Sequence, residues 1–416
     1  MMRVLVLTHR LPYAPNRGDR LRMYHMLQHL RTRAELELVS LIHDDEEAVH
    51  VEDVRAFVPR VTALRVPPWR TRFNAAAALI THQPLTHAFL DAPGVWAAIQ
   101  DSVERRCPDV VFAYCSGMAK FALQPPLDRV PLVLDFVDID SQKWRDLAAE
   151  SRWPHSWIYR REAATLGAFE ARAAGHASTA LVVNEREAEL ARALTPTANI
   201  QVLSNGVDLE RLRPRGAPTA TPRVVFCGVM DYAPNDEGMQ WFVRDVWPLV
   251  LERRPDATLS IVGPGPTQAL RNLCEADRSI AVTGRVPDVR DWLWESAVGI
   301  APLRVARGVQ NKALEAIAAG LPIVITEAVA GGLPPEAAPA CRVANTPERF
   351  AEQLVDLLRR PPADRRAIAA GADLSALQWS RTLDTLWPIL ERSAASIRRD
   401  SAIEPALAKA PRWESV

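Results

Sequence analysis

A short stretch around residue 310 gathers side chains that suit phosphate and sugar binding. On a helical wheel Gly308, Asn311, Lys312 and Glu315 cluster within one arc, and apolar residues and alanines fall opposite them. A helix placed here, stopped by Gly320, buries one face and presents the other to a ligand. The alternative interpretation is an ordinary amphipathic helix whose polar face is solvated.

Cations surround the expected beginning of this helix. The loop Arg304 to Gly308 leads into it, and Arg304, Arg307 and Lys312 bring positive charge to the same place. The amino-terminus of a helix favours an anion because its first backbone N–H groups are unpaired and its dipole end is positive. Glu315, one turn further on, can accept hydrogen bonds from vicinal hydroxyls such as those of a ribose. The pattern therefore predicts a site for a diphosphate with a sugar ring attached.

The helix is set between two apolar runs that predict strands, residues 297–302 and 322–326. The same alternation of strand and helix recurs along the chain. Strands are expected at residues 4–8, 36–42, 61–66, 110–114, 132–136, 179–183, 224–227, 258–262, 279–282, 298–301 and 323–325. This alternation predicts an α/β protein with parallel sheets covered by helices on both faces.

Length and composition narrow the class of protein. The chain has 416 residues, more than one core usually fills, which predicts two domains. Its formal net charge is zero, which argues against a general nucleic-acid binder. The five cysteines are scattered without metal-binding spacing, and no run is long enough for a signal peptide or a spanning helix. We expect a cytoplasmic protein with reduced thiols that acts on small molecules.

A second polar segment, DFVDIDSQKW, follows the expected strand at 132–136 and contains Asp138, Asp140 and Lys143. Two carboxylates separated by a single residue can hold a divalent cation on a diphosphate. In the other interpretation Asp140 or Ser141 is the N-cap of the following helix. We prefer a site without metal, because the cations at 304–312 already neutralise phosphate charge.

At residues 308–326 the run GVQNKALEAIAAGLPIVIT resembles the donor-binding motif of retaining, family-4 glycosyltransferases of the GT-B fold. It is most similar to the sugar transferases associated with exosortase (PEP-CTERM) exopolysaccharide systems, which DFVDIDSQKW and the MDYAPN loop at residues 230–235 also resemble. This resemblance extends to about residue 395.

The resemblance implies two facing Rossmann-like domains. Their expected bounds are 1–210 for the acceptor side and 211–376 for the nucleotide-sugar side, with a helix at 377–396 returning to the first domain and a disordered tail at 397–416. Lys312 and Arg307 would stabilise the leaving group, and Asp138, Asp140 and Lys143 would line the acceptor side. The donor-binding residues would be Gly18, Gly228, Arg304, Gly308, Gln310, Asn311 and Glu315.

The implied activity is transfer of a sugar from a nucleotide diphosphate sugar to a lipid-linked glycan acceptor, without metal or cofactor. Two alternatives stay open, a sugar-nucleotide epimerase of the same fold and a non-catalytic nucleotide-sugar-binding protein. The second is suggested by Arg307, which stands where most of the wider family has the first glutamate of an E-x7-E motif. Val229 and Glu237 likewise stand in places that often hold cations, which indicates a relocated phosphate clamp.

Aromatic and basic residues alternate in SRWPHSWIYRRE, residues 151–162. The combination suits contact with anionic lipid head groups or a lipid-linked diphosphate, which would place the protein at the inner face of the cytoplasmic membrane. The alternative is an amphipathic helix that packs on its own domain.

Overall fold

The computed structural model describes residues 1–14, 18–68, 74, 78, 81, 83–306 and 308–395, and divides into two compact units. The first comprises residues 1–203 together with the described residues from Leu383 onward, and the second spans Ser204–Thr382. The predicted domain division after residue 210 lies seven residues beyond the boundary at Leu203. The predicted disordered tail, residues 397–416, lies outside the described residues.

The first unit is built on a parallel sheet. Its described strands are β1 (Met2–Thr8), β2 (Ala34–Ile42), β3 (Arg60–Arg65), β4 (Val110–Tyr114), β5 (Leu132–Val137), β6 (Thr179–Val182) and β7 (Ile200–Val202). They stand in the order β3-β2-β1-β4-β5-β6-β7, and every pair is parallel. The direction of winding therefore reverses between β1 and β4, as in doubly wound folds.

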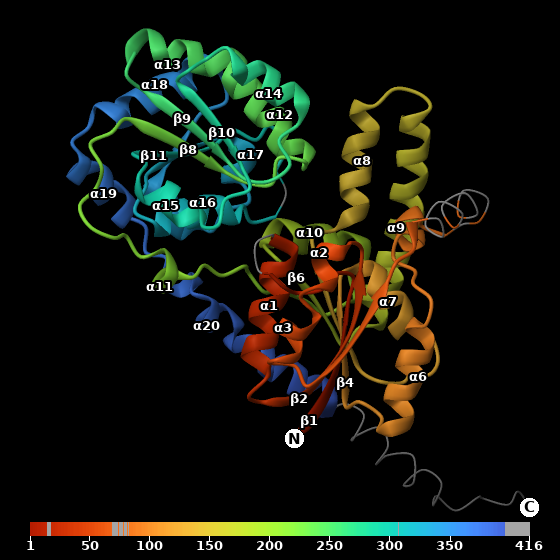
Figure 1. Cartoon of the computed structure of the whole chain (residues 1–416). Helices are drawn as coiled ribbons and strands as arrows, with labels where there is room; N and C mark the ends of the chain where they lie inside the picture. The colour runs from red at the N-terminus through yellow and green to blue at the C-terminus, as the bar shows by residue number, and fades with distance from the viewer. Residues whose placement is uncertain are drawn as a thin grey trace, which may run out of the picture. The chain divides into compact units, whose positions relative to one another are not determined.

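Helices lie on both sides of this sheet (Figure 1). They are α1 (Gly18–Leu30), α2 (Asp45–Ala48), α3 (Val51–Arg55), α5 (Leu85–Ala88), α6 (Val95–Arg105), α7 (Ser116–Ala122), α8 (Asp140–Glu150), α9 (His155–His176) and α10 (Glu185–Leu194). The 3-10 turn η4 (Leu383–Thr385) and the helical residues 386–395 complete the described part of the unit. The strands read as continuous apolar runs because both faces of the sheet are buried.

Buried ion pairs tie helices of the first unit to its sheet. Arg22 of α1 and Asp135 of β5 are both fully buried, and Arg22 Nε donates to Asp135 Oδ2 at 2.8 Å. The same carboxylate accepts from the backbone N–H of Val137 at 3.0 Å. A charge without a partner at this depth is strongly destabilising, so the two side chains depend on each other.

The second unit repeats the architecture with a six-stranded parallel sheet. Its strands are β8 (Arg223–Cys227), β9 (Thr258–Val262), β10 (Ile280–Gly284), β11 (Val298–Ala301), β12 (Ile323–Ile325) and β13 (Cys341–Val343), in the order β10-β9-β8-β11-β12-β13. β13, which the sequence patterns did not predict, is a three-residue edge strand that pairs with β12. The winding reverses between β8 and β11.

The helical segments of the second unit include α12, which continues through a π-helical turn, η1, into α13. The segments are α11 (Leu209–Leu212), α12 (Ala233–Trp241), η1 (Phe242–Val246), α13 (Trp247–Arg253), α14 (Gln268–Glu275), α15 (Val289–Trp294), α16 (Asn311–Ala318), α17 (Glu327–Ala330), η2 (Pro335–Ala340), α18 (Pro347–Arg359), α19 (Pro362–Ala370), η3 (Ser375–Leu377) and α20 (Trp379–Thr382). The core contains an aromatic cluster in which the Phe242 ring lies 6.0 Å from that of Trp247 and 5.6 Å from that of Phe350. The helix predicted at residues 377–396 is interrupted by η4.

Candidate functional site

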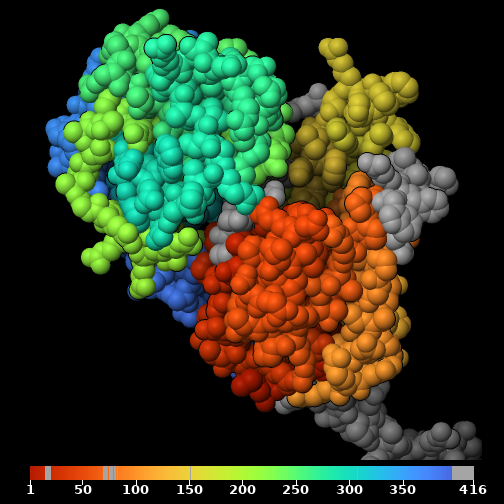
Figure 2. All heavy atoms as spheres, viewed as in Figure 1, coloured from red at the N-terminus to blue at the C-terminus, as the bar shows by residue number. Residues whose placement is uncertain are grey.

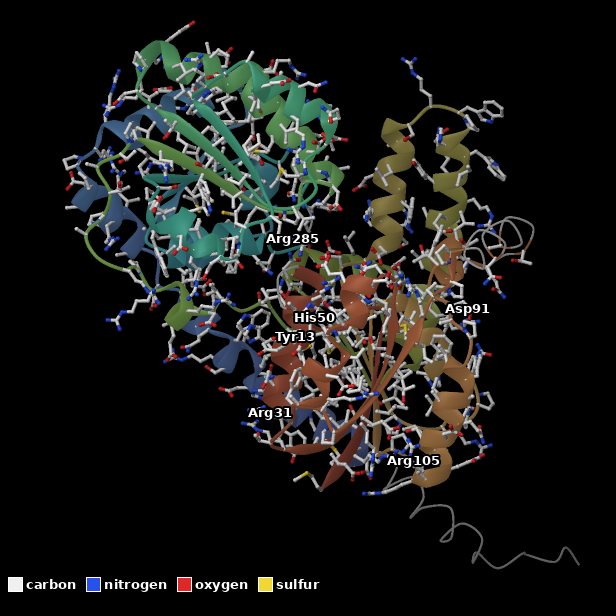
Figure 3. The ribbon with its side chains drawn as sticks, in the orientation of Figure 1. Tyr13, Arg31, His50, Asp91, Arg105 and Arg285 are labelled. Carbon is white, nitrogen blue, oxygen red and sulfur yellow. The ribbon has the colours of Figure 1, made fainter. Side chains whose placement is uncertain are left out.

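The carboxyl edge of the second sheet is where this topology forms a ligand site. In a doubly wound sheet the crevice opens at the strand ends where the winding reverses, here the ends of β8 and β11. Gly228 directly follows β8, and the loop that contains Arg304 and Gly308 follows β11. Arg285, which follows β10, is an exposed cation at the same edge (Figure 3).

Two glycine-bearing loops meet at this edge with their backbones in contact. Gly263, after β9, has a φ of 143°, and a Cβ there would lie 1.8 Å from the carbonyl oxygen of Gly228. The Gly228 N–H donates to the Val262 carbonyl at 2.9 Å, and the Met230 N–H donates to the Pro264 carbonyl at 2.8 Å. Only glycine fits at residue 263, and the two loops form one bonded backbone layer.

Helix α16 begins later than the wheel pattern predicted. Its first residue is Asn311, and Gly308 adopts a φ of 59° in the preceding loop. The expectation that Gly308 lies on the helix was wrong, because its left-handed backbone cannot continue a right-handed helix. Within α16 the predicted core residues Ala313, Ala316 and Ile317 are buried, and Leu314 is buried as well.

Lys312 is held by polar side chains at the carboxyl end of β8. Its ammonium donates to Asn235 Oδ1 at 2.7 Å and to Gln310 Oε1 at 3.3 Å, and Nζ lies 5.4 Å from the centre of the Phe226 ring. The side chain is half-buried. Burial lowers the pKa of Lys312 to about 8. The neighbouring Glu315 and Cys227 raise the pKa, but their effect is smaller than that of burial. The interpretation of Lys312 as part of a solvated helix face is wrong.

Glu315 stands one turn further along α16 and is also half-buried. Burial raises the pKa of its carboxyl, while the cations of Lys312 and Arg211 act in the opposite direction. Nearby, burial raises the pKa of the Cys227 thiol, which therefore stays protonated at neutral pH. The edge thus carries an ammonium and a carboxyl in one partly desolvated place, which suits the charged and hydroxylated parts of a nucleotide sugar.

Asn235 is a site residue that sequence reasoning missed. It lies near the start of α12 and is almost fully buried. Its Nδ2 donates to the Val229 carbonyl at 2.7 Å while its Oδ1 accepts from Lys312, so one amide joins the glycine loop to the lysine. The only signal in the sequence is an asparagine inside the MDYAPN loop, just after the strand and glycine.

Asn311 is anchored from another part of the second unit. Asn205 is buried and donates from Nδ2 to Asn311 Oδ1 at 3.1 Å. This contact ties the NGVD turn at residues 205–208 to the first residue of α16. The Asn311 side chain is therefore partly engaged within the protein.

The other residues expected in or near the donor site are Gly18, Arg304, Arg307, Val229 and Glu237. Arg304 is exposed in the loop before α16, and Arg307 lies outside the described residues. Gly18 is the first residue of α1 in the first unit. Val229 contributes its carbonyl to Asn235, and Glu237 is exposed. The structure therefore brings together Gly228, Gln310, Asn311, Lys312 and Glu315 with Asn235.

The predicted acceptor-side residues stand at the carboxyl end of β5 in the first unit. Asp138 and Asp140 are half-buried, and Lys143 is exposed on α8. The expectation that Asp140 or Ser141 caps α8 was wrong, because the N-cap is Ile139, which has no side-chain acceptor.

Buried glutamates from other helices take over the role of that cap. Glu187 accepts from the Ile139 N–H at 2.8 Å, and Glu170 accepts from the Ser141 N–H at 3.2 Å. Burial raises the pKa of Glu170 to about 8, against the hydrogen bonds from Ser141. Within the described residues no group of three or more His, Cys, Asp or Glu side chains is arranged to hold a metal ion.

Comparisons with known proteins agree with this architecture. Residues 221–360, most of the second unit, match the family described as Glycosyl transferases group 1. No curated protein matches the chain by sequence.

Solved glycosyltransferase structures match over almost the whole chain. A sucrose-phosphate synthase from Thermosynechococcus elongatus has a TM-score of 0.68 at 14% identity, covering 97% of this chain and 100% of that one. HepE from Anabaena, solved in complex with UDP, has a TM-score of 0.64 at 14% identity with 96% and 100% covered. An α,α-trehalose 6-phosphate synthase from Burkholderia multivorans has a TM-score of 0.62 at 14% identity with 95% and 100% covered. The predicted GT-B fold is confirmed.

Proposed function

We propose that this protein is a retaining glycosyltransferase that moves a sugar from a nucleotide diphosphate sugar onto a lipid-linked glycan acceptor in exopolysaccharide synthesis. The observation that carries the proposal is the half-buried Lys312, which Asn235 holds beside the glycine loops at the end of β8, with the half-buried Glu315 one turn further along α16. The match of residues 221–360 to group 1 glycosyltransferases supports the reaction class. The lipid-linked acceptor and the exopolysaccharide role rest on the resemblance to exosortase-linked transferases alone.

The nucleotide part of the donor is supported by a neighbour of the same fold. HepE from Anabaena was solved with UDP and with UDP-glucose. In this chain Gly228 and Gly263 carry no side chain, so the backbone at this edge can approach a diphosphate closely. Glu315 would accept hydrogen bonds from the ribose hydroxyls.

Lys312 would act on the leaving group. As the bond between the sugar and the diphosphate breaks, negative charge grows on the departing phosphate, and a cation fixed beforehand stabilises that charge without reorganising. Asn235 and Gln310 fix the ammonium of Lys312 by hydrogen bonds. Arg307, four residues before the start of α16 in the sequence, would add a second cation, and we assign no catalytic base.

Neutralisation by Lys312 removes the need for a divalent cation on the diphosphate. We therefore propose that turnover is independent of metal. Activity that disappeared with a chelator and returned with manganese would favour Asp138 and Asp140 as metal ligands instead.

A thermal-shift screen of nucleotide sugars with different bases tests the donor, since a ligand at 100 times its Kd stabilises the folded protein by about 2.7 kcal/mol. The donor that binds is then incubated with a membrane lipid extract, and release of nucleoside diphosphate and labelling of lipid are measured. Transfer to lipid supports the proposal. Isomerisation of the donor without any acceptor would identify an epimerase, and binding without turnover would identify a non-catalytic protein.

A further inference from the structure

Helices α8 and α9 form a hairpin in the first unit. α8 starts three residues after the end of β5, and the loop 151–154 connects it to α9. Figure 1 shows the hairpin projecting beyond the carboxyl edge of the first sheet, and Figure 2 shows its surface. With eleven residues in α8, the loop lies about 16 Å from that edge at a rise of 1.5 Å per residue.

Two tryptophans are exposed at the end of this hairpin. Trp153 in the loop is 82% exposed and Trp157 in the first turn of α9 is 56% exposed, more than Trp96, the next tryptophan among the described residues, at 40%. Exposed apolar side chains that gather at one place often mark an interaction site. An indole has an apolar body and a polar N–H, which suits the head-group level of a bilayer.

The charge around these tryptophans is positive. Residues 151–161 contain Arg152, Arg160 and Arg161 and no Asp or Glu, in a chain whose total formal charge is zero. Arg152 and Arg160 are exposed, whereas Arg161 is mostly buried and donates to backbone carbonyls, among them that of Gln83 at 3.1 Å. Glu162, the nearest acid after them, is buried and accepts from the Leu85 N–H. The exposed charge of the segment therefore complements an anionic surface.

The hairpin holds the backbone of these residues in an ordered turn. The ring of Trp144 on α8 lies 5.3 Å from that of Tyr159 on α9, which packs the two helices together near the loop. The Ser156 N–H donates to the Arg152 carbonyl at 3.1 Å, and the Trp157 N–H donates to the Pro154 carbonyl at 3.2 Å. Trp153 and Trp157 are thus presented by an ordered turn, so little conformational entropy is lost on docking.

We propose that the end of this hairpin, formed by Arg152, Trp153, Trp157 and Arg160, docks on an anionic phospholipid bilayer. The two indoles enter the head-group layer, and the two guanidinium groups pair with lipid phosphates. The contact is peripheral, because no helix in the described parts of the chain is long and apolar enough to cross a membrane. The inference goes beyond the proposed function and does not require sugar transfer; where the acceptor is lipid-linked, the docked hairpin would hold the carboxyl edge of the first sheet close to the lipid surface.

Co-sedimentation of the full chain with vesicles tests this inference without any nucleotide sugar. Vesicles of phosphatidylcholine alone are compared with vesicles that also contain phosphatidylglycerol, at low and high salt. The variants are Trp153→Ala with Trp157→Ala, and Arg152→Ala with Arg160→Ala. Matched controls in the same unit are Trp96→Ala on α6 and Arg31→Ala, which lies at the end of α1 (Figure 3).

We expect binding to the anionic vesicles that weakens with salt. Burying about 60 Å² of each indole strengthens partitioning into the vesicles by about tenfold. Replacing both tryptophans should therefore weaken partitioning by about 100-fold. Replacing both arginines should weaken partitioning into anionic vesicles by about 30-fold, which is about fivefold for each charge removed. The two controls should bind like the unchanged protein.

Three results would overturn the proposal. The first is no binding to anionic vesicles, and the second is binding that both hairpin variants retain. The third is a self-associated protein that does not bind vesicles and becomes monomeric in the tryptophan variant, which would identify a protein interface instead. Circular dichroism verifies that each variant is folded, so a loss of binding reports on the surface itself.

Discussion

Replacing Lys312 by methionine should change activity and stability in opposite directions. Methionine keeps the length of the side chain and removes the charge, so it separates the electrostatic role of Lys312 from its packing. If the ammonium serves the leaving phosphate, its loss lowers turnover. If the buried charge is held there at a cost in stability, its loss does not destabilise the fold.

The stability change follows from the environment of Lys312. Burial lowers its pKa from 10.5 to about 8, which corresponds to about 3 kcal/mol for holding the charged form in the folded protein. Replacing the lysine removes this cost. About 1 kcal/mol of the gain in stability is lost again, because Asn235 Oδ1 no longer has a donor. Glu315 also loses a neighbouring cation. We expect a net stabilisation of about 1 kcal/mol at pH 7, seen as a melting temperature higher by about 2–4 °C.

The stability difference should also depend on pH in a defined way. Since the folded protein releases the Lys312 proton at a lower pH than the unfolded chain does, the cost of the charge is fully present below pH 8. It disappears as the pH rises from about 8 to 10.5. The advantage of the methionine variant should therefore shrink across this range.

Turnover should fall by about 10²–10³ in Lys312→Met, the loss typical of removing one preorganised donor to a developing charge. Nucleotide-sugar affinity should change less, because the charge on the phosphate is greatest in the transition state. The alkaline limb of kcat/KM should have an apparent pKa of about 8, where free Lys312 becomes neutral. Lys312→Arg should move that limb to higher pH because a guanidinium stays charged.

The assay combines release of nucleoside diphosphate with thermal melting for each variant. Arg271→Ala is the matched control, since it removes an exposed cation from α14 of the same unit and should leave turnover and stability nearly unchanged. A methionine variant that melts at lower temperature and loses activity in proportion would mean that Lys312 only supports the fold. Equal, small effects in Lys312→Met and Arg271→Ala would refute the leaving-group assignment.

Three further predictions concern buried or half-buried carboxyl groups. Glu315→Ala should weaken nucleotide binding by about 1.5–3 kcal/mol in calorimetric titration, because it removes a charged acceptor for the ribose, and unchanged affinity in a folded variant would exclude it from the site. The pKa of Glu170 is raised to about 8, so its contribution to stability is complete below about pH 4.5 and is lost as the pH rises through 8. Between pH 5 and pH 9 the melting temperature of Glu170→Gln should therefore fall by fewer degrees than that of the unchanged protein. Equal falls in both proteins would contradict the raised pKa of Glu170. Asp135→Ala should lower the free energy of unfolding by about 3–5 kcal/mol in urea titrations because it leaves Arg22 buried without its carboxylate, whereas joint replacement by Arg22→Met and Asp135→Leu should recover most of that loss.

The sheets could be predicted from the sequence because their strands are buried on both faces. Runs such as residues 110–114 and 258–262 consist almost wholly of apolar and β-branched residues, and the structure has strands with those bounds. β13 escaped prediction because Cys341–Val343 is a short edge strand with a polar arginine at its centre. Its pairing with β12 depends on a neighbour that is distant in sequence.

The site was predicted less completely than the fold. The helical wheel placed Lys312 and Glu315 on one face, but it could not tell that this face is half-buried, because the covering residues come from other elements. Asn235, 77 residues before Lys312, is one of them, and its pairing with the lysine is a tertiary contact. Gly308 was placed on the helix because periodicity does not report the sign of φ.

The way α8 is capped has a consequence for the order of events during synthesis. The amino-terminal N–H groups of α8 are satisfied by Glu170 and Glu187, which follow about 30 and 48 residues later in the chain. When α8 leaves the ribosome neither partner has yet emerged from it, and a helix of eleven residues is marginal alone in water. The hairpin should therefore become protected from hydrogen exchange only on nascent chains long enough to include α10, so its maturation is tied to completion of the sheet beside it.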